Sequence, residues 1–355
     1  MFLKSTLICA FALSAAFAGD EALTQAKQGR AQDPLFLTIT NGANNFLAVV
    51  NTSTKQTDYV PTGGFGGASG NSGGVAVSGN LAAAVNFGST NVTIFVRRGN
   101  AMEPTQLIKT SSQPVSVAFG HNHLVVLGQT TAESFAVFGN AVTKDNDGVV
   151  QLAKGDKSAA QILTFDGGVV YSEKSGSVAE LNLSTNAVAG ISGPNRSIQL
   201  PNAPNNDTPF GMAARGANVY VTIAHSNLEA LVVNGQIMSL AAGPTPFKDG
   251  SGAIIHAPCW NALAGQFLFS ADSPGKQLYR YLVSDTNIFF DKASAAKLAG
   301  SPTDLTVEDN LLGVIDGGDG ATSNVSLFDI DSEGELTLRF AVKIAGPING
   351  AAIIQ

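Results

Sequence analysis

Pro302-Thr303-Asp304-Leu305 begins an alternating apolar run, and openings of this kind recur about every 40–50 residues along the chain. Each opening is a small residue or proline followed by an apolar run, and a second apolar run comes behind it. The other openings are Gly74-Val75-Ala76-Val77, Pro114-Val115-Ser116-Val117, Ala160-Gln161-Ile162-Leu163, Pro209-Phe210-Gly211-Met212, Gly252-Ala253-Ile254-Ile255 and Pro347-Ile348-Asn349-Gly350. A repeat of this length that contains only strands predicts a β-propeller.

The second apolar run of each repeat is rich in Val, Leu and Ala, as at residues 81–85 and 311–315. Runs that are apolar on both faces belong to strands covered on both sides, as when neighbouring blades pack face to face. The chain therefore predicts an all-β, seven-bladed propeller. Residues 34–355 are expected to form this single domain, because blades stack around one axis.

The two ends of the repeat region complete each other. Residues 46–50 form an apolar run without an inner strand before it, and residues 348–354 supply a strand of the missing type. Pairing the C-terminal segment with the strand near Phe46 would close the ring and remove the exposed edges of an open stack.

The first residues have the features of a secretory signal. Lys4 supplies a positive charge, residues 7–17 are apolar, and Ala16-Phe17-Ala18 is a small-x-small cleavage site. Residues 1–18 are thus a predicted signal peptide, and polar residues 19–33 a predicted disordered stub. The apolar stretch is too short to span a bilayer, so we expect a protein that is secreted to the extracellular space or cell wall.

Other features fit a secreted glycoprotein. The N-x-Ser/Thr sequons are Asn51, Asn91, Asn182, Asn195, Asn206 and Asn324. Several sequons behind a signal peptide suggest a eukaryotic secreted glycoprotein. After cleavage Cys259 has no partner for an internal disulfide, and we interpret it as a small buried apolar residue.

Charge excludes one class of partner. The net charge is −7 and no basic block is present. Because phosphate binding needs clustered Lys and Arg, nucleic acid is not an expected partner. A small molecule in the central channel is expected instead, bound by a monomer. The glycine-rich residues 63–74 lack the strand, helix and Lys-Ser/Thr pair of a phosphate cradle, and we interpret them as a flexible inter-blade loop.

A few polar residues fall on the expected inner strands or on the loops beyond the second strands. His256 and Asp304 come from consecutive inner strands, and an imidazole oriented by a carboxylate is a workable general base. The alternative is a hydrogen-bonded core histidine and an aspartate that caps a turn. The residues expected to bind a substrate, in part through its carboxylate, are Arg215, Lys174, Gln161 and Asn349.

Metal binding is the second chemical option. Asn349, Asp304, Asp316 and Glu173 could offer oxygen ligands to calcium. Nothing in their spacing requires an ion, so no metal site and no cofactor are predicted.

One segment points to a family. Asn324-Val325-Ser326-Leu327-Phe328-Asp329-Ile330-Asp331-Ser332-Glu333-Gly334-Glu335-Leu336-Thr337 resembles the repeat of the seven-bladed lactonase family, which includes 6-phosphogluconolactonase-type proteins and the fungal 3-carboxymuconate cyclases. Members of that family carry Gly-Pro-His or Pro-Arg-His openings on inner strands. Here only Gly252-Ala253-Ile254-Ile255-His256 comes close, and the arginine is missing.

Two functions follow as hypotheses. The resemblance implies a fungal protein that is a hydrolase or cyclase and acts on a small carboxylated lactone, and the channel residues His256, Asp304 and Arg215 are the groups expected to carry the reaction. The alternative is a non-catalytic propeller that binds a glycan, a small molecule or a protein. Fold likeness alone does not decide between them.

Overall fold

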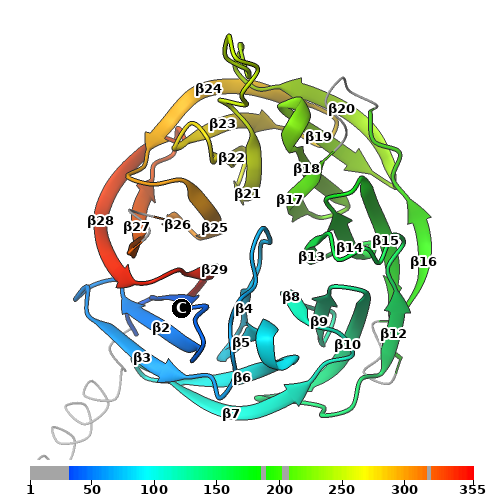
Figure 1. Cartoon of the computed structure of the whole chain (residues 1–355), viewed down its shortest axis with the longest axis vertical. Coiled ribbons are helices and arrows are strands. Elements are labelled where there is room, and N and C mark those ends of the chain that lie inside the picture. Colours follow the sequence, from blue (N-terminus) through cyan, green and yellow to red (C-terminus); the bar gives the residue numbers. More distant parts are fainter. Residues whose placement is uncertain (1–31, 185–188, 202–207, 318–320) are drawn as a thin grey trace, which may run out of the picture.

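The computed structural model describes residues 32–184, 189–201, 208–317 and 321–355. These residues form an all-β ring of seven antiparallel sheets, the blades of a propeller (Figure 1). The predicted fold class is confirmed. The expected signal peptide lies outside the described residues, as does the stub up to residue 31. Of the rest of the stub, Asp33 is held in place, because its carbonyl accepts a hydrogen bond from Arg97 Nη2.

Each blade is ordered from the channel outward. The inner strands are β4 (Val75–Ser78), β8 (Pro114–Gly120), β13 (Ala159–Phe165), β17 (Pro209–Arg215), β21 (Pro258–Ala264), β25 (Pro302–Glu308) and β29 (Asn349–Ile354). The second strands are β1 (Leu35–Ile39), β5 (Leu81–Asn86), β9 (His123–Gly128), β14 (Gly168–Glu173), β18 (Asn218–Ile223), β22 (Phe267–Asp272) and β26 (Leu311–Asp316).

The outer half of each blade follows the same order. The third strands are β2 (Phe46–Asn51), β6 (Asn91–Arg98), β10 (Thr131–Phe138), β15 (Ser177–Leu183), β19 (Leu228–Val233), β23 (Gln277–Val283) and β27 (Thr322–Ile330). The outer strands are β3 (Thr57–Pro61), β7 (Ala101–Lys109), β11 (Ala141–Val142) with β12 (Gly148–Gln151), β16 (Ile191–Ser197), β20 (Gln236–Ala242), β24 (Ile288–Lys297) and β28 (Leu336–Ala345). Two 3₁₀ turns, η1 (Phe87–Ser89) and η2 (Ala224–Ser226), follow second strands.

Burial explains why the second strands are so apolar. Every residue of all seven second strands is buried, for example throughout β5 and β26. A strand in this position has a neighbouring strand on each side and a neighbouring blade on each face, so no side chain reaches water. The hydrophobic core therefore lies between blades and runs around the ring.

The ring closes where the two ends of the chain meet. Strand β29 pairs with β1, with Leu35 opposite Ile354 and Phe36 opposite Ile353. The inner strand β29 also contacts those of both neighbouring blades, β25 and β4. Closure by pairing of the N- and C-terminal segments is thus confirmed.

The expected neighbour of the C-terminal segment was wrong in one detail. The strand near Phe46 is β2, which lies one place further out, and β1 lies between it and β29. All five residues of β1 are buried, as the second position requires, whereas Phe46 is half-buried. The run at residues 46–50 resembled a second strand because it is apolar throughout, and residues 47–50 are in fact buried.

The inner strand of the sixth blade also begins later than expected. It starts at Pro258, and Gly252-Ala253-Ile254-Ile255 belongs to the long connection before it. An inner strand must run directly into the turn before its second strand, here at Gly265, and a strand at 252–255 would leave that turn far too long.

Candidate functional site

Residues 63–74, here called the plug, lead from β3 into β4 at the face of the ring where the inner strands begin. Figure 1 shows the chain entering β4 in the middle of the ring. We call this side the plug face and the side where the inner strands end the open face. Far from being a flexible loop, the plug is hydrogen-bonded to several other blades.

Asn71 makes the first set of these hydrogen bonds. Its side-chain amide and that of Asn349 donate to each other, at 3.0 and 2.9 Å. The Asn71 carbonyl accepts a hydrogen bond from Trp260 Nε1 at 3.0 Å, and its Nδ2 donates to the carbonyl of Val115 at 2.5 Å. Asn71 thus joins three inner strands, β29, β21 and β8, across the mouth of the channel.

Asp304 anchors the next two plug residues. Its carboxylate accepts hydrogen bonds from Ser72 Oγ at 2.8 Å and from the Gly73 N–H at 2.9 Å. The N–H of Ser72 in turn donates to the carbonyl of Ala160 at 3.1 Å. Burial raises the pKa of Asp304 to about 6, although these hydrogen bonds favour the charged form. Asp304 is therefore a structural anchor of the plug rather than an open acid–base group.

Close approach explains why this segment is rich in glycine. A Cβ on Gly74 would lie 2.1 Å from Asn349 Oδ1, nearer than any real contact. Gly73 has a φ of +70°, and a Cβ there would lie 2.9 Å from Ser116 Oγ. Only glycine lets the backbone pass this close to the inner strands. The interpretation as a flexible loop was therefore wrong.

Lys174 and Asn349 were expected to bind substrate, yet both contact the plug. Lys174 Nζ donates to the carbonyl of Gly70 at 2.5 Å and lies 5.4 Å from the centre of the Phe210 ring. Burial lowers the pKa of this ammonium. The groups that line the mouth are thus already paired with the chain itself.

Gln161 and Arg215 lie away from that mouth. Gln161 binds both backbone groups of Met212, through Nε2 to the carbonyl at 3.1 Å and through Oε1 from the N–H, and so links β13 to β17. Arg215 ends β17 at the open face, where Nη1 donates to the carbonyl of Gly265 at 2.6 Å and Nη2 lies 3.6 Å from Asp285. The structure does not bring the predicted substrate-binding residues together.

His256 precedes β21 and does not meet Asp304. Its Nδ1 lies 2.9 Å from Asp272 Oδ2, a carboxylate with no exposed surface. Asp272 also accepts hydrogen bonds from the Tyr279 hydroxyl at 2.7 Å and from the Ala257 N–H at 3.0 Å. Because the Asp272 carboxylate accepts hydrogen bonds, we assign the imidazole proton to Nδ1. Nε2 is then the acceptor of the ring, which is partly exposed. The carboxylate that orients His256 is Asp272, and the expected pairing with Asp304 was wrong.

The corrected start of β21 also changes the motif comparison. The opening of this strand is Pro258-Cys259-Trp260, so cysteine and tryptophan stand where the resemblance would place arginine and histidine. Trp260 packs edge-on against Phe210 at 5.1 Å. Burial, with a smaller contribution from Asp272, raises the pKa of Cys259 to about 12. Neither residue replaces the missing acid–base or cationic groups.

Below the plug, the channel contains a cavity of about 280 Å³ between four inner strands. Its wall is formed by Gln161, Leu163, Thr164, Met212, Ala213, Ala214, Asn261, Ala262, Leu263, Leu305, Thr306 and Val307. Met212, Asn261 and Leu305 are buried, whereas residues further along the same strands, such as Ala213, Leu263 and Val307, are partly exposed. The cavity therefore opens toward the open face and is closed toward the plug.

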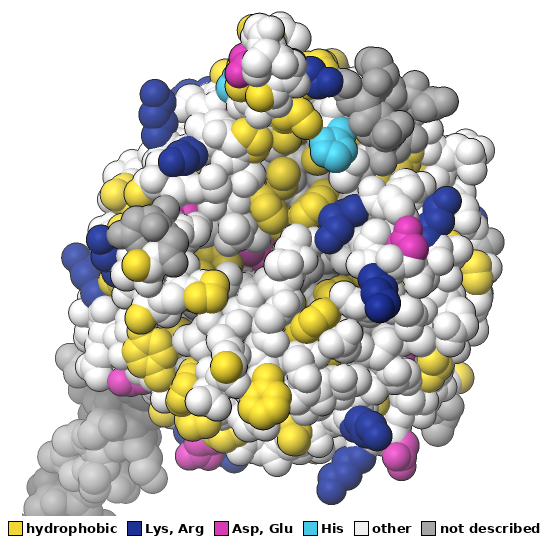
Figure 2. All heavy atoms as spheres, in the orientation of Figure 1, with side chains coloured by type: hydrophobic (Ala, Val, Ile, Leu, Met, Phe, Trp, Pro, Cys, Tyr) yellow, Lys and Arg dark blue, Asp and Glu magenta, His cyan; other side chains and the backbone are white. Residues whose placement is uncertain are grey.

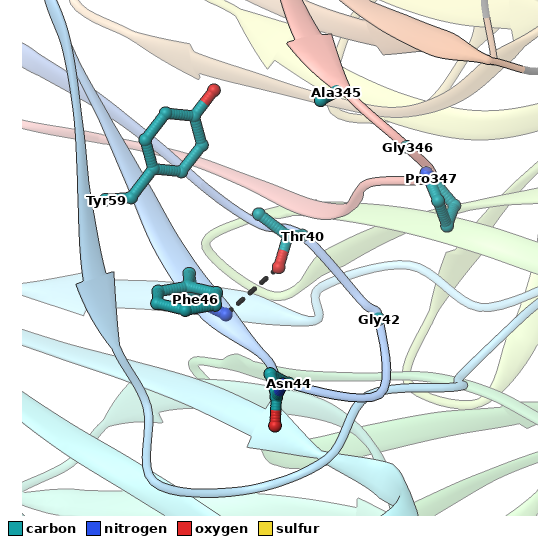
Figure 3. A pocket seen from close by; sticks show the side chains of 8 residues that line it. All are labelled: Thr40, Gly42, Asn44, Phe46, Tyr59, Ala345, Gly346 and Pro347. Atoms are coloured by element: carbon teal, nitrogen blue, oxygen red, sulfur yellow. Dashed lines mark hydrogen bonds between the residues drawn. The ribbon is translucent and has the colours of Figure 1, made fainter.

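A second hollow lies on the surface next to the closing blade. It has a volume of about 370 Å³ and lies between Phe46, Tyr59 and Pro347 (Figure 3). The hydroxyl of Thr40 accepts a hydrogen bond from the Phe46 N–H at 3.0 Å, which fixes one edge. No carboxylate, imidazole or cationic side chain lines this hollow, so it offers no acid–base chemistry.

Charge on the surface is dispersed. Figure 2 shows Lys and Arg side chains scattered around the face in view, alone or beside one other, with no large basic block. Among the described residues, no group of three or more His, Cys, Asp or Glu side chains is placed to hold a metal ion. None of the helices in the described part is long and apolar enough to cross a bilayer.

The predicted sequons differ in accessibility. Asn182 is exposed. Asn324 and Asn51 are largely buried; Asn324 Nδ2 donates to Asp316 Oδ1 at 2.6 Å, and Asn51 Oδ1 accepts hydrogen bonds from two backbone N–H groups. Asn91 Nδ2 donates to the carbonyl of Ser89 at 3.1 Å. Asn206 and the side chain of Asn195 lie outside the described part of the chain.

Comparison with known proteins shows similarity in structure but not in sequence. No family model matches the chain, and no curated protein sequence matches it. A candidate 6-phosphogluconolactonase of Bacteroides fragilis has a TM-score of 0.68 at 13% identity, with 91% of this chain and 98% of that chain covered. The periplasmic gluconolactonase of Pseudomonas aeruginosa has a TM-score of 0.64 at 12% identity, with 91% and 99% covered.

The likeness extends to other propellers. The WD40 β-propeller domain of Doa1 has a TM-score of 0.55 at 11% identity, with 81% of this chain and 90% of that chain covered. Identities this low establish the fold alone. The chain is a seven-bladed propeller with the architecture of these lactonase structures.

Proposed function

We propose that this protein is a binding propeller that takes a small, uncharged molecule into its channel from the open face. The observation that carries the proposal is the plug. It occupies the mouth of the channel and pairs with Asp304, Asn349 and Lys174, the polar groups that a ligand would otherwise meet there. The remaining cavity is reached from the other side.

The chemistry of that cavity sets the class of ligand. Its wall contains no Asp, Glu, Lys, Arg or His, and two of its four polar side chains, Gln161 and Thr164, hydrogen-bond to backbone carbonyls. A carboxylate placed there would lose its hydration without gaining a cation as partner, at a large cost in free energy. A neutral molecule therefore fits this wall better than a charged one.

The size of the cavity limits the ligand. An engineered apolar protein cavity of about 150 Å³ holds benzene. By proportion, a cavity of about 280 Å³ has room for a molecule of about ten non-hydrogen atoms. This is the size of a bicyclic aromatic compound.

One observation favours a second function, hydrolysis of a lactone on the plug face. The Nδ1 atom of His256 lies 2.9 Å from Asp272 Oδ2, which orients the ring, and the ring is partly exposed. Nε2 is the ring nitrogen left to accept a proton. An imidazole held in this way can act as a general base toward water. Lys174 is the cation nearest to the mouth, although its ammonium already contacts Gly70.

Secretion remains part of the proposal on the grounds of the sequence. The predicted signal peptide and sequons support an extracellular or cell-wall protein. In that setting a closed ring without disulfides would rely on its core and on blade closure for stability.

The binding function is tested with 2-naphthol, a neutral probe of the proposed size, in titration calorimetry with the full chain. Ala213→Trp would fill the cavity and should weaken binding at least tenfold. Ala141→Trp, at an exposed position on β11, is the matched control and should bind as the wild type does. Equal binding by the wild type and Ala213→Trp would overturn the channel as the site.

The second function is tested by hydrolysis of gluconolactone, with and without a chelator. Activity that is lost in His256→Ala and kept in His225→Ala would establish His256 as the base. Loss of activity with the chelator would point to calcium. No hydrolysis by the wild type would leave binding as the function.

A further inference from the structure

The hollow beside the closing blade has walls that are held in place by hydrogen bonds. They come from the turn after β1, from β2 and β3, and from residues 345–347 at the end of β28. Thr40 and Phe46 exchange two hydrogen bonds, at 2.9 and 3.0 Å. On the opposite wall, the carbonyl of Gly346 accepts a hydrogen bond from Ser323 Oγ at 2.7 Å. A ligand therefore meets a preformed site and pays little for ordering it.

Two aromatic rings form one side of this hollow. Figure 3 shows Phe46 and Tyr59 across from Ala345 and Pro347. Tyr59 is 47% exposed, and Phe46 is half-buried. Figure 2 shows hydrophobic side chains gathered at the lower left of the face in view, over the closing blade. Apolar surface that gathers around a hollow, instead of being scattered singly, is typical of a binding site.

The polar groups of the hollow are neutral. They are the hydroxyls of Thr40 and Tyr59 and the amide of Asn44. A charged ligand would find no counter-ion among the lining residues. A wholly apolar ligand would keep part of its surface in water, because Tyr59 and Pro347 are themselves exposed. Both limits favour a neutral ligand with an apolar face and a polar edge.

A pyranose ring has this character. In a β-linked glucose residue all ring substituents are equatorial, so each face presents only C–H groups and the hydroxyls project from the edge. The C–H face packs against the negatively polarised face of an aromatic ring, while the hydroxyls bind neutral side chains or water. The volume of about 370 Å³ lies in the range of small-molecule pockets and has room for one such residue.

A further exposed ring lies close to the hollow. Phe65 of the plug is 55% exposed. The N–H of its neighbour Gly66 donates to the carbonyl of Gly42, a residue of the wall, at 2.8 Å. A chain of sugar residues that begins in the hollow can therefore continue toward a second aromatic side chain.

We infer that the hollow between Phe46, Tyr59 and Pro347 binds a neutral, β-linked hexopyranose residue of a glycan. Tyr59 is the ring on which the sugar stacks. The site is separate from the channel, and the inference does not depend on the proposed binding function.

The site is tested with cellotriose, a neutral oligomer of β-linked glucose, by titration calorimetry and saturation-transfer NMR with the full chain. The wild type should bind cellotriose, and Tyr59→Ala should weaken binding about fivefold or more. Tyr59→Phe keeps the ring and should bind as the wild type does. Phe289→Ala is the matched control, because it removes a ring that is 59% exposed on β24, away from the hollow.

Three results would overturn the inference. Equal binding by the wild type and Tyr59→Ala would place the sugar elsewhere, and no binding by the wild type would exclude this class of ligand. Binding of 2-naphthol that depends on Tyr59, without binding of cellotriose, would assign the hollow to apolar ring compounds. Ala213→Trp, which fills the channel, should bind cellotriose as the wild type does, so failure of this site and failure of the channel are told apart.

Discussion

Replacing Glu229 by Gln should stabilise the protein at alkaline pH. The side chain has no exposed surface, and burial raises its pKa from 4.5 to about 7, although Asn261 and Ser270 donate hydrogen bonds to it. At about 1.4 kcal/mol per pH unit, this rise corresponds to about 3 kcal/mol. Glutamine keeps the shape and carries no charge, so it removes that penalty.

The sign of the pH dependence follows from the direction of the shift. The folded protein holds the Glu229 proton more tightly than the unfolded chain does. The stability that the proton provides is complete below about pH 4.5 and is lost as the pH rises through about 7. Relative to the wild type, Glu229→Gln should therefore gain nothing near pH 4.5 and about 3 kcal/mol at pH 8.5.

Urea unfolding at these two pH values measures the difference in the free energy of unfolding. Glu333→Gln, on an exposed turn, is the control and should change little at either pH. The reasoning is refuted if the difference in the free energy of unfolding between Glu229→Gln and the wild type is the same at pH 8.5 as at pH 4.5. That result would mean that folding does not raise the pKa of Glu229.

Three further predictions concern the plug and the surface. Gly74→Ala should lower the free energy of unfolding by about 2 kcal/mol or more in urea titration, because the new Cβ would lie 2.1 Å from Asn349 Oδ1; unchanged stability would show that the plug does not pass close to β29. In glycopeptide mass spectrometry of the secreted protein, Asn182 should carry a glycan while Asn324, whose amide is hydrogen-bonded and largely buried, should not; a glycan on Asn324 would contradict its burial. Sequencing of the secreted chain should find Gly19 at its N-terminus, and an N-terminus at Met1 would remove the signal peptide from the account.

The sequence was sufficient for the architecture, because strand burial follows from composition. Runs such as residues 81–85 and 311–315 are apolar on both faces, and only strands inside a stack of sheets tolerate that. The number of blades and the closure of the ring followed from the repeat. The order of β1 and β2 did not, since both have mostly buried residues and composition does not distinguish a second strand from a third.

The site was much less predictable. Residues 252–255 lie too far before the turn at Gly265 to form the inner strand, and this distance could have placed the strand at Pro258. The apolar Ile254-Ile255 pair before His256 nevertheless resembled a strand. The partner of His256 is Asp272, and this pairing becomes visible only when the inner strand is started at Pro258. The role of the plug could not be inferred, because Asn71 bonds to Asn349 across 278 positions and no local pattern encodes such a contact.

Asn261 shows the same limit. Nothing in its sequence neighbourhood marks it as a residue of the cavity wall, and its partner Glu229 comes from a different blade. A hint was available in Glu229 itself, a charged residue within an apolar third strand. Such a residue must be paired or neutral when buried, and it points to polar side chains on the adjacent blade.

The central claim is that the chain closes the mouth of its own channel with residues 63–74. Amide hydrogen exchange of peptides from this segment tests it most directly, because the N–H groups of Gly66, Ser72 and Gly73 are all hydrogen-bonded. The account predicts slow exchange there, comparable to that of the neighbouring strand β5. Exchange at the rate of an exposed glycine-rich linker would contradict it, and the channel mouth would then be open to ligands.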